Sequence, residues 1–179
     1  ISLNIIFSYI ITVFWIVGII NAINWLDGLD GLASGFSFII FIALIIIPQN
    51  NFSISYTNIN ISLAGACLGF LFFNLYPSKI IMGDCGSNFL GYSISTLSLI
   101  SSSSKISDNL ISANLNFFPI LILLIPILDM LSVILLRLKK KKSPFFPDRS
   151  HFHHRLLDFG LNVPTTVFLL LGITEILTI

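Results

Sequence analysis

Polar side chains that can bind a cation recur at three-residue steps directly after an apolar run. They are Asn21, Asn24, Asp27 and Asp30. A glycine follows each aspartate, which lets a ligand approach the backbone. Burying such groups at a membrane edge is costly unless they bind something, so this stretch predicts a ligand or metal site. A helix cap followed by a turn is the structural alternative. An EF-hand is excluded, because its ligand spacing and its final Glu are missing.

A second stretch, MGDCGS at residues 82–87, holds Asp84 between two glycines. The hydroxyl of Ser87 is expected to cap the helix that follows. Asp and Gly are also ordinary turn formers, so this stretch alone carries little information.

A third stretch gathers histidine and arginine after a run of lysines at residues 139–142. Its members are Arg149, His151, His153, His154 and Arg155. Three histidines are a ligand set that zinc accepts. The arginines between them favour an anionic ligand, because guanidinium pairs bidentately with phosphate. The lysines are explained by the charge bias of membrane proteins and by attraction to anionic lipid.

These groups combine oxygen ligands for a hard cation with cationic groups for phosphates. Such a set suits a reaction at a diphosphate, where a hard cation such as Mg²⁺ neutralises charge on the oxygens.

The elements that must position these groups are membrane helices. Hydrophobic residues make up 55% of the chain and charged residues 9%, and the mean hydropathy is +0.98. Six apolar runs are long enough to suggest crossings of a bilayer, at residues 5–20, 32–48, 59–75, 87–100, 117–136 and 164–179. We therefore predict an all-α, polytopic integral membrane helical bundle with about six transmembrane helices. It forms one membrane-embedded domain over residues 1–179, and both ends look cut.

Basic residues mark the sides of the membrane. Of the nine Lys and Arg residues, only Lys105 falls in the loops 49–58 and 101–116. The other eight fall in or beside the loops that hold the three polar stretches, so these loops are expected in the cytoplasm. Among the remaining polar groups, Asp129 is expected to support packing or the site. Gly65 and Gly69 are expected to mark close helix packing.

Four segments together resemble the polyprenyl-phosphate N-acetylhexosamine-1-phosphate transferases, the family that includes the WecA, TagO and MraY enzymes. They are NAINWLDGLDGLASG from residue 21, MGDCGSNFLGY from 82, PILDMLSV from 126 and PDRSHFHHRLLDFGL from 147. The motifs occur in the family's order and cover nearly the whole chain. The His-x-His-His form resembles the WecA/TagO branch rather than the MraY branch.

The resemblance implies transfer of a HexNAc-1-phosphate, with GlcNAc as the expected sugar, from a UDP-sugar to undecaprenyl phosphate. UMP is released, Mg²⁺ or Mn²⁺ is required, and the product starts cell-envelope polysaccharide synthesis. It implies a multi-pass protein of the bacterial inner membrane whose site faces the cytoplasm. Membrane lipid is an expected partner, nucleic acid is not, and a homodimer is compatible with the sequence.

By motif position, the resemblance assigns metal ligation to Asn24 and Asp84. Catalytic roles fall to Asp27, Asp30 and Asp84. The expected substrate-binding residues are Asn21, Arg149, His151, His153, His154 and Arg155. The family's adjacent acidic pair near the lipid phosphate is missing from these 179 residues. The chain by itself is therefore expected to be inactive.

Two other classes compete with this assignment. A secondary transporter would hold its polar groups near mid-membrane in a broken helix, whereas these groups collect at one surface. An alcohol phosphatidyltransferase would continue its Asp-Gly motif with further aspartates, but Asp30-Gly31 is followed by LASGFSFIIF.

Overall fold

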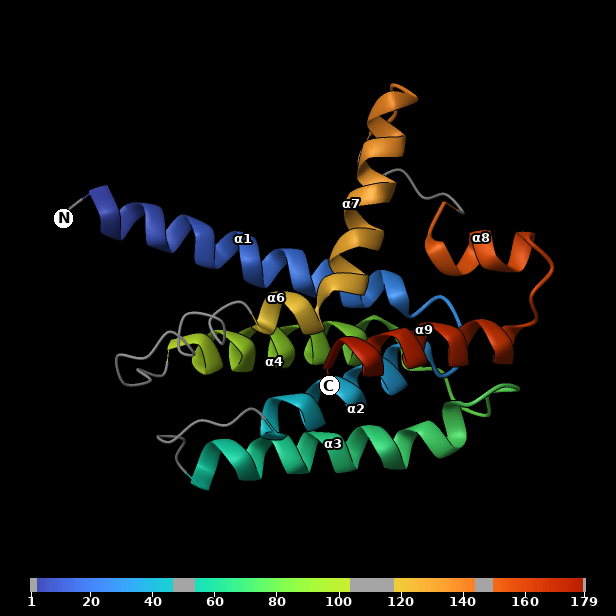
Figure 1. Cartoon of the computed structure of the whole chain (residues 1–179), viewed down its shortest axis with the longest axis horizontal. Helices are drawn as coiled ribbons and strands as arrows, with labels where there is room; N and C mark the ends of the chain where they lie inside the picture. The colour runs from blue at the N-terminus through green and yellow to red at the C-terminus, as the bar shows by residue number, and fades with distance from the viewer. Residues whose placement is uncertain (1–2, 47–53, 104–117, 144–149, 179) are drawn as a thin grey trace.

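The computed structural model describes residues 3–46, 54–103, 118–143 and 150–178, and the regular secondary structure in these ranges is helical (Figure 1). The all-α prediction is confirmed for this part of the chain. The helices are α1 (Leu3–Leu26), α2 (Leu32–Ile46), α3 (Ile54–Asn74), α4 (Gly83–Ser103), α6 (Phe118–Ile122), α7 (Leu124–Lys139), α8 (Phe152–Asp158) and α9 (Val163–Thr178).

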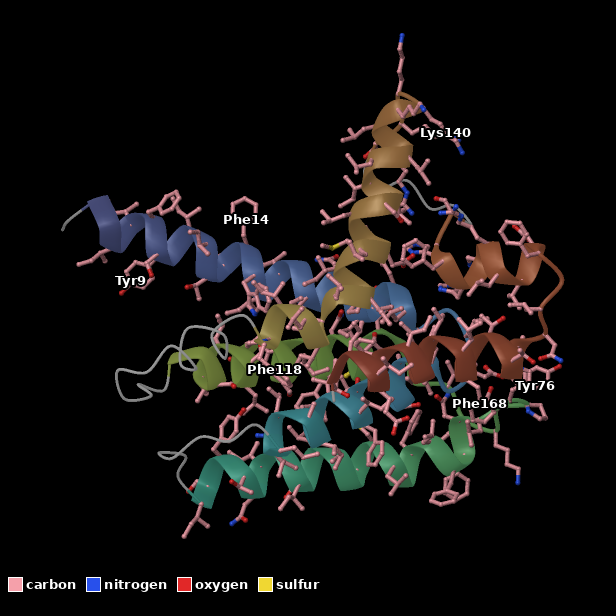
Figure 2. All side chains as sticks on the ribbon, in the orientation of Figure 1. Tyr9, Phe14, Tyr76, Phe118, Lys140 and Phe168 are labelled. Atoms are coloured by element: carbon pink, nitrogen blue, oxygen red, sulfur yellow. The ribbon has the colours of Figure 1, made fainter. Side chains whose placement is uncertain are left out.

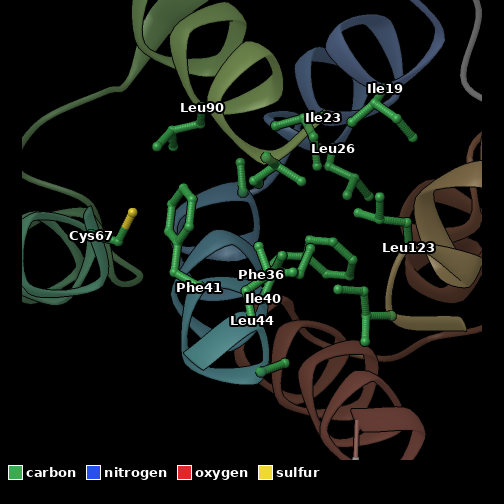
Figure 3. Packing of buried hydrophobic residues seen from close by; sticks show 14 of the residues in the cluster. Ile19, Ile23, Leu26, Phe36, Ile40, Phe41, Leu44, Cys67, Leu90 and Leu123 are labelled. Carbon is green, nitrogen blue, oxygen red and sulfur yellow. The ribbon is translucent and has the colours of Figure 1, made fainter. Parts of the chain in front are cut away.

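Helix α2 is the centre of the packing, because it contacts α3, α4 and α9 and also touches α1. Its side chains Phe36, Ile40 and Leu44 are almost fully buried and meet residues of α1 and α4 in one apolar cluster (Figure 3). Cys67 of α3 is also buried at the edge of this cluster, as a small apolar filler. The cluster holds together the ends of the helices that carry the polar stretches.

A glycine allows α1 and α4 to pack at close range. A Cβ at Gly91 of α4 would lie 2.7 Å from the Cα of Ile20 in α1. The contact therefore depends on a residue without a side chain. The prediction of close packing at Gly65 and Gly69 is wrong within the described residues. Nothing lies within 4 Å of a Cβ built at either position, because this face of α3 points outward.

The predicted span at residues 117–136 is not one continuous helix. Helix α6 ends at Ile122 and α7 begins at Leu124. Pro126 has no backbone N–H to donate to the preceding turn, and its ring crowds that turn, so the helix breaks here. Figure 1 shows α7 running across the direction that α1, α3, α4 and α9 share.

Two helices in the described ranges are long and apolar enough to cross a bilayer: residues Ile5–Leu26 of α1, and α3. Helices α2 and α9 are apolar but shorter. Large apolar side chains such as Tyr9, Phe14 and Phe168 are exposed on the surface (Figure 2). An apolar surface of this kind requires a cover of lipid or of other helices.

Candidate functional site

The first polar stretch spans the end of α1 and the turn before α2. Asn24 lies in the last turn of α1, whereas Asp27 and Asp30 lie in the turn at residues 27–31. Gly31 closes this turn at a φ of +81°, a conformation that suits glycine. Oδ2 of Asp30 accepts a 3.0 Å hydrogen bond from the backbone N–H of Ser78. This bond ties the first polar stretch to the loop that follows α3.

Asn74 fastens the same two segments, and the sequence analysis missed it. Its side-chain oxygen accepts bonds from Gly31 N (3.1 Å) and Ser34 Oγ (2.9 Å), and its side-chain nitrogen donates to the Ile80 carbonyl (2.9 Å). The residue is 4% exposed. An amide at the end of an apolar run, next to a predicted site, was the available signal.

The second stretch meets the first through Asn24. The amide nitrogen of Asn24 donates to Asp84 Oδ1 at 3.2 Å and to Ser87 Oγ at 2.9 Å. Asp84 occupies the first turn of α4, where the helix dipole favours a negative charge. The prediction that Ser87 caps α4 is wrong, because the helix already begins at Gly83 and Ser87 lies inside it. Ser87 instead supplies a buried acceptor for Asn24.

Asp27 lies among the carboxylates of this region. Its pKa is raised to about 6, mainly because the carboxyl is partly buried; a backbone hydrogen bond from Gly83 opposes the shift, and the negative charges of Asp84 and Asp30 add to it. A carboxylate that resists ionisation beside two others indicates a place where a cation would be stabilised.

The third stretch is held in place by α7. Oδ2 of Asp129 lies 2.8 Å from Nδ1 of His151, and its Oδ1 accepts a 2.6 Å bond from the backbone N–H of Phe152, the first residue of α8. Asp129 is 2% exposed. One buried carboxylate therefore orients a histidine ring and satisfies a free N–H at the start of α8.

Aromatic contacts join this stretch to α1. Trp25 meets the ring of His151 edge-on at 5.4 Å, and the guanidinium of Arg137 lies 5.1 Å from the centre of the Trp25 ring. The rings of His151 and His153 stack at 5.5 Å, and His154 lies 4.3 Å from His153. Trp25, which stands inside the first polar motif, thus supports the histidine stretch as well.

His153 reaches the first stretch directly. A Cβ at Gly28 would lie 2.6 Å from Nε2 of His153, so the missing side chain makes room for the ring. His153 is 1% exposed, and neither ring nitrogen has a hydrogen-bond partner among the residues that the structure describes. Its pKa is lowered to about 4, mainly by burial and also by the neighbouring His154 and His151, whereas Asp129 opposes the shift. A neutral buried imidazole with unused nitrogens can hydrogen-bond to a ligand at this point.

Not every predicted residue joins this cluster. Asn21 donates to the Val17 carbonyl of its own helix (2.8 Å). Arg155 is exposed on α8. Arg149 lies outside the described residues. Among the described ranges, no group of three or more His, Cys, Asp or Glu side chains is placed to hold one metal ion.

The donor set at Asn24 and Asp84 nevertheless fits a magnesium ion. Mg²⁺ binds one or two protein oxygens and completes its shell with water and substrate phosphates. Amide O and N are exchanged by a simple flip of the Asn24 side chain, which would present its oxygen beside Asp84. The carboxylates of Asp84 and Asp30 lie close enough to Asp27 to help raise its pKa, although burial is the main cause.

Comparison with known proteins agrees with the family resemblance seen in the sequence. The model of the family "Glycosyl transferase family 4" matches residues 1–102. A "Probable undecaprenyl-phosphate N-acetylglucosaminyl 1-phosphate transferase" of Bacillus subtilis (strain 168) is 42% identical over 155 residues, which are 87% of this chain and 42% of that protein.

Two further relatives match shorter parts. A "Decaprenyl-phosphate N-acetylglucosaminephosphotransferase" of Mycobacterium tuberculosis (strain ATCC 25618 / H37Rv) is 39% identical over 110 residues, 57% of this chain and 27% of that protein. A "Phospho-N-acetylmuramoyl-pentapeptide-transferase" of Prochlorococcus marinus (strain NATL2A) is 45% identical over 73 residues, 38% of this chain and 19% of that protein. The chain thus spans less than half the length of these relatives. Its more extensive matches are to the N-acetylglucosaminyl phosphate transferases, which confirms the predicted branch.

Proposed function

The chain belongs to glycosyl transferase family 4, and from this premise we propose that its protein transfers GlcNAc-1-phosphate from UDP-GlcNAc to undecaprenyl phosphate. An oxygen of the lipid phosphate bonds to the phosphorus that carries the sugar. The phosphoanhydride bond breaks, and UMP leaves with the electron pair. The observation that carries the proposal is the convergence of three polar stretches, far apart in sequence, at the end of α1.

In this proposal Asn24 and Asp84 hold a Mg²⁺ or Mn²⁺ ion, which neutralises charge on the diphosphate oxygens. Asp27 and Asp30 line the nucleotide-sugar site, and the bond from Ser78 fixes the position of Asp30. His153 donates a ring N–H to a phosphate or sugar oxygen. His151, held by Asp129, orders the stretch that also carries His154 and Arg155.

Burial argues for a substrate phosphate rather than bulk water around His153. A buried imidazole without hydrogen bonds is unfavourable by itself and becomes favourable when an acceptor arrives. Asn21, Arg149 and Arg155 complete the proposed substrate contacts, although the structure does not bring Asn21 or Arg155 into the cluster.

We further propose that residues 1–179 form one membrane-embedded domain of about six transmembrane segments in the bacterial inner membrane, with this site in the cytoplasm. The product would begin a cell-envelope polysaccharide. The charge asymmetry of the loops and the exposed apolar helices support this arrangement.

The test is UMP release by the intact protein in detergent, supplied with undecaprenyl phosphate, Mg²⁺ and either UDP-GlcNAc or UDP-GalNAc. UDP-GlcNAc should be turned over faster. Asp84→Asn should lower turnover by at least about a hundredfold, because charge neutralisation by a bound metal contributes several kcal/mol. Asp158→Asn, which changes an exposed carboxylate at the end of α8, is the matched control.

Full activity of Asp84→Asn would show that this aspartate only forms the turn before α4. Uptake of solute into vesicles, with no UMP released from any UDP-sugar, would favour a transporter instead.

A further inference from the structure

Trp25 links the end of α1 to α7 and to the start of α8. The centre of its ring lies 5.1 Å from the guanidinium of Arg137 in the last turn of α7, and 5.4 Å from the His151 ring, at an interplanar angle of 68°. A cation beside an aromatic ring and a tilted pair of rings are both favourable arrangements. The preceding residue, Asn24, reaches Asp84 of α4 instead. Two consecutive side chains of α1 therefore contact the two halves of the site.

The position of His153 depends on ring packing, because no polar partner holds it. Neither of its ring nitrogens has a hydrogen-bond partner among the described residues, although the side chain is 1% exposed. The ring stacks on that of His151 at 5.5 Å, with only 9° between the two planes, and His154 lies beside it at 4.3 Å. The tilt of the His151 ring therefore influences the tilt of the His153 ring.

Asp129 alone does not fix that tilt. Its carboxylate lies 2.8 Å from a single atom of the His151 ring, Nδ1, and a contact at one atom leaves the tilt of a ring largely open. The Trp25 ring supplies a second contact, on the ring as a whole. Gly28, which makes room for His153, follows Trp25 by one helical turn, so both ends of the stacked pair rest on the same short segment.

We propose that Trp25 is a positioning residue for His153. Through the His151 ring it holds the His153 imidazole where, in the proposed transferase, a ring N–H meets an oxygen of the bound UDP-sugar. A small displacement of a binding group is costly, so removal of the Trp25 ring weakens substrate binding from outside the substrate contact. The inference rests on the proposed function and gives Trp25 no role at the metal.

The test compares two replacements of Trp25 in the intact protein, by the KM for UDP-GlcNAc in UMP release. Trp25→Leu fills space without an aromatic ring and should raise the KM at least about tenfold, because a hydrogen bond to a charged group contributes that factor. Trp25→Phe keeps a ring for both neighbours and should stay within about threefold of the parent. Partial unfolding lowers the amount of active enzyme without altering the KM of the remainder, so the KM separates positioning from a loss of structure.

An unchanged KM in Trp25→Leu, or equal KM values in the two variants, would overturn this inference while UMP release by the parent upholds the proposed function. Absence of UMP release from the parent would overturn the proposed function and this inference with it.

Trp15 provides the matched control in the same helix. Its indole N–H donates to the Ser95 carbonyl and to the Ser98 hydroxyl, both at 3.3 Å. Trp15→Leu should therefore lower the midpoint of thermal unfolding and leave the KM unchanged. A tenfold rise of the KM in this variant would show a general effect of α1 and would overturn the specific role of Trp25.

The route through His153 is tested by combining variants. Trp25→Leu in a His153→Ala background should raise the KM by less than about twofold further, since the ring that it positions is already missing. A further tenfold rise would show that Trp25 meets the substrate directly, and the positioning role would be overturned.

Discussion

At the scale of single residues, Asp129 carries two tasks with one carboxylate. It orients the His151 ring and accepts a hydrogen bond from the backbone N–H of Phe152. Asp129 is buried, so water does not compete for these two contacts. Removal of the carboxylate leaves two donors without a partner, each of which costs about 1–3 kcal/mol. The order of the histidine stretch therefore depends on a side chain of another helix.

We expect Asp129→Ala to lower the free energy of unfolding by about 2–4 kcal/mol and to lower UMP release as well. Asp129→Asn keeps one acceptor oxygen, so it should retain more stability than Asp129→Ala. Thermal unfolding in detergent and turnover of the intact protein measure the two effects. Ser132→Ala is the control on the same helix, since the Ser132 hydroxyl donates only to the Asp129 backbone carbonyl. Unchanged stability of Asp129→Ala would contradict the structure around α8.

His153 predicts a specific response to acid. Its pKa is lowered to about 4 in the folded protein, below the ordinary value of 6.5. Between these values the unfolded chain binds more protons than the folded one, so stability falls as the pH decreases from about 6.5 to about 4. The contribution is at most about 1.4 kcal/mol per pH unit.

We expect His153→Gln to flatten this part of the stability curve, because glutamine does not titrate. The midpoint of thermal unfolding, followed from pH 7.5 to about pH 4.5, measures the effect. His154→Gln is the comparison at the neighbouring, less buried position. Parallel curves for His153→Gln and the parent would show that another group causes the acid sensitivity.

At the scale of helices, the distance between α1 and α4 sets the distance between Asn24 and Asp84. Gly91 controls this spacing, because an added Cβ would meet the backbone of Ile20 at 2.7 Å. Backbone cannot move aside as a flexible side chain can, so the helices must separate.

We expect Gly91→Ala to destabilise the protein by about 1–3 kcal/mol and to weaken activation by Mg²⁺. Gly65→Ala is the matched control in α3, where a Cβ meets nothing within 4 Å. That change should be neutral, or stabilising by up to about 1 kcal/mol, because alanine favours helix over glycine. Similar behaviour of the two variants would contradict the close approach of α1 and α4.

Sequence patterns predict most elements but not their breaks. The apolar runs locate α1, α2, α3 and α9, since hydrophobic length is a direct signal. The break at Leu123 is not predicted by the hydropathy pattern, because the residues on both sides of Pro126 continue the same apolar run. The close packing expected at Gly65 and Gly69 is not found among the described residues, because spacing cannot tell which face of a helix has a neighbour.

In the site, too, some residues can be predicted from the sequence and others cannot. Motif residues Asn24, Asp84 and His153 could be chosen from residue type and resemblance, and the structure brings their stretches together. Asn74 and the double role of Asp129 depend on contacts across more than twenty residues, which no local pattern contains. The part of Asn21 and Arg155 in substrate binding remains a prediction.

At the scale of the whole molecule, the arrangement of charge predicts sidedness. Lys140 is exposed at the tip of α7, on the side of the polar stretches, whereas Ser55 is exposed at the start of α3, toward the opposite end. The bias of Lys and Arg predicts that the first side lies in the cytoplasm.

We expect Ser55→Cys to react with a membrane-impermeant maleimide in intact cells, and Lys140→Cys to react only after the membrane is permeabilised. Both are made in a background that lacks Cys67 and Cys85. Labelling of Lys140→Cys in intact cells would show that the predicted orientation is wrong. The site would then face away from the cytoplasmic UDP-sugar.

The contact between Gly28 and His153 also has a consequence for the synthesis of the protein. The two residues are 125 positions apart (153 − 28), so the ribosome must add that many residues before the ring can reach its place. At about 5–20 residues per second, this takes on the order of 6–25 s. During that interval the carboxylates at the end of α1 lack the histidine stretch that packs beside them. A nascent chain arrested before α8 would therefore leave the polar groups at the end of α1 exposed, which the finished protein does not.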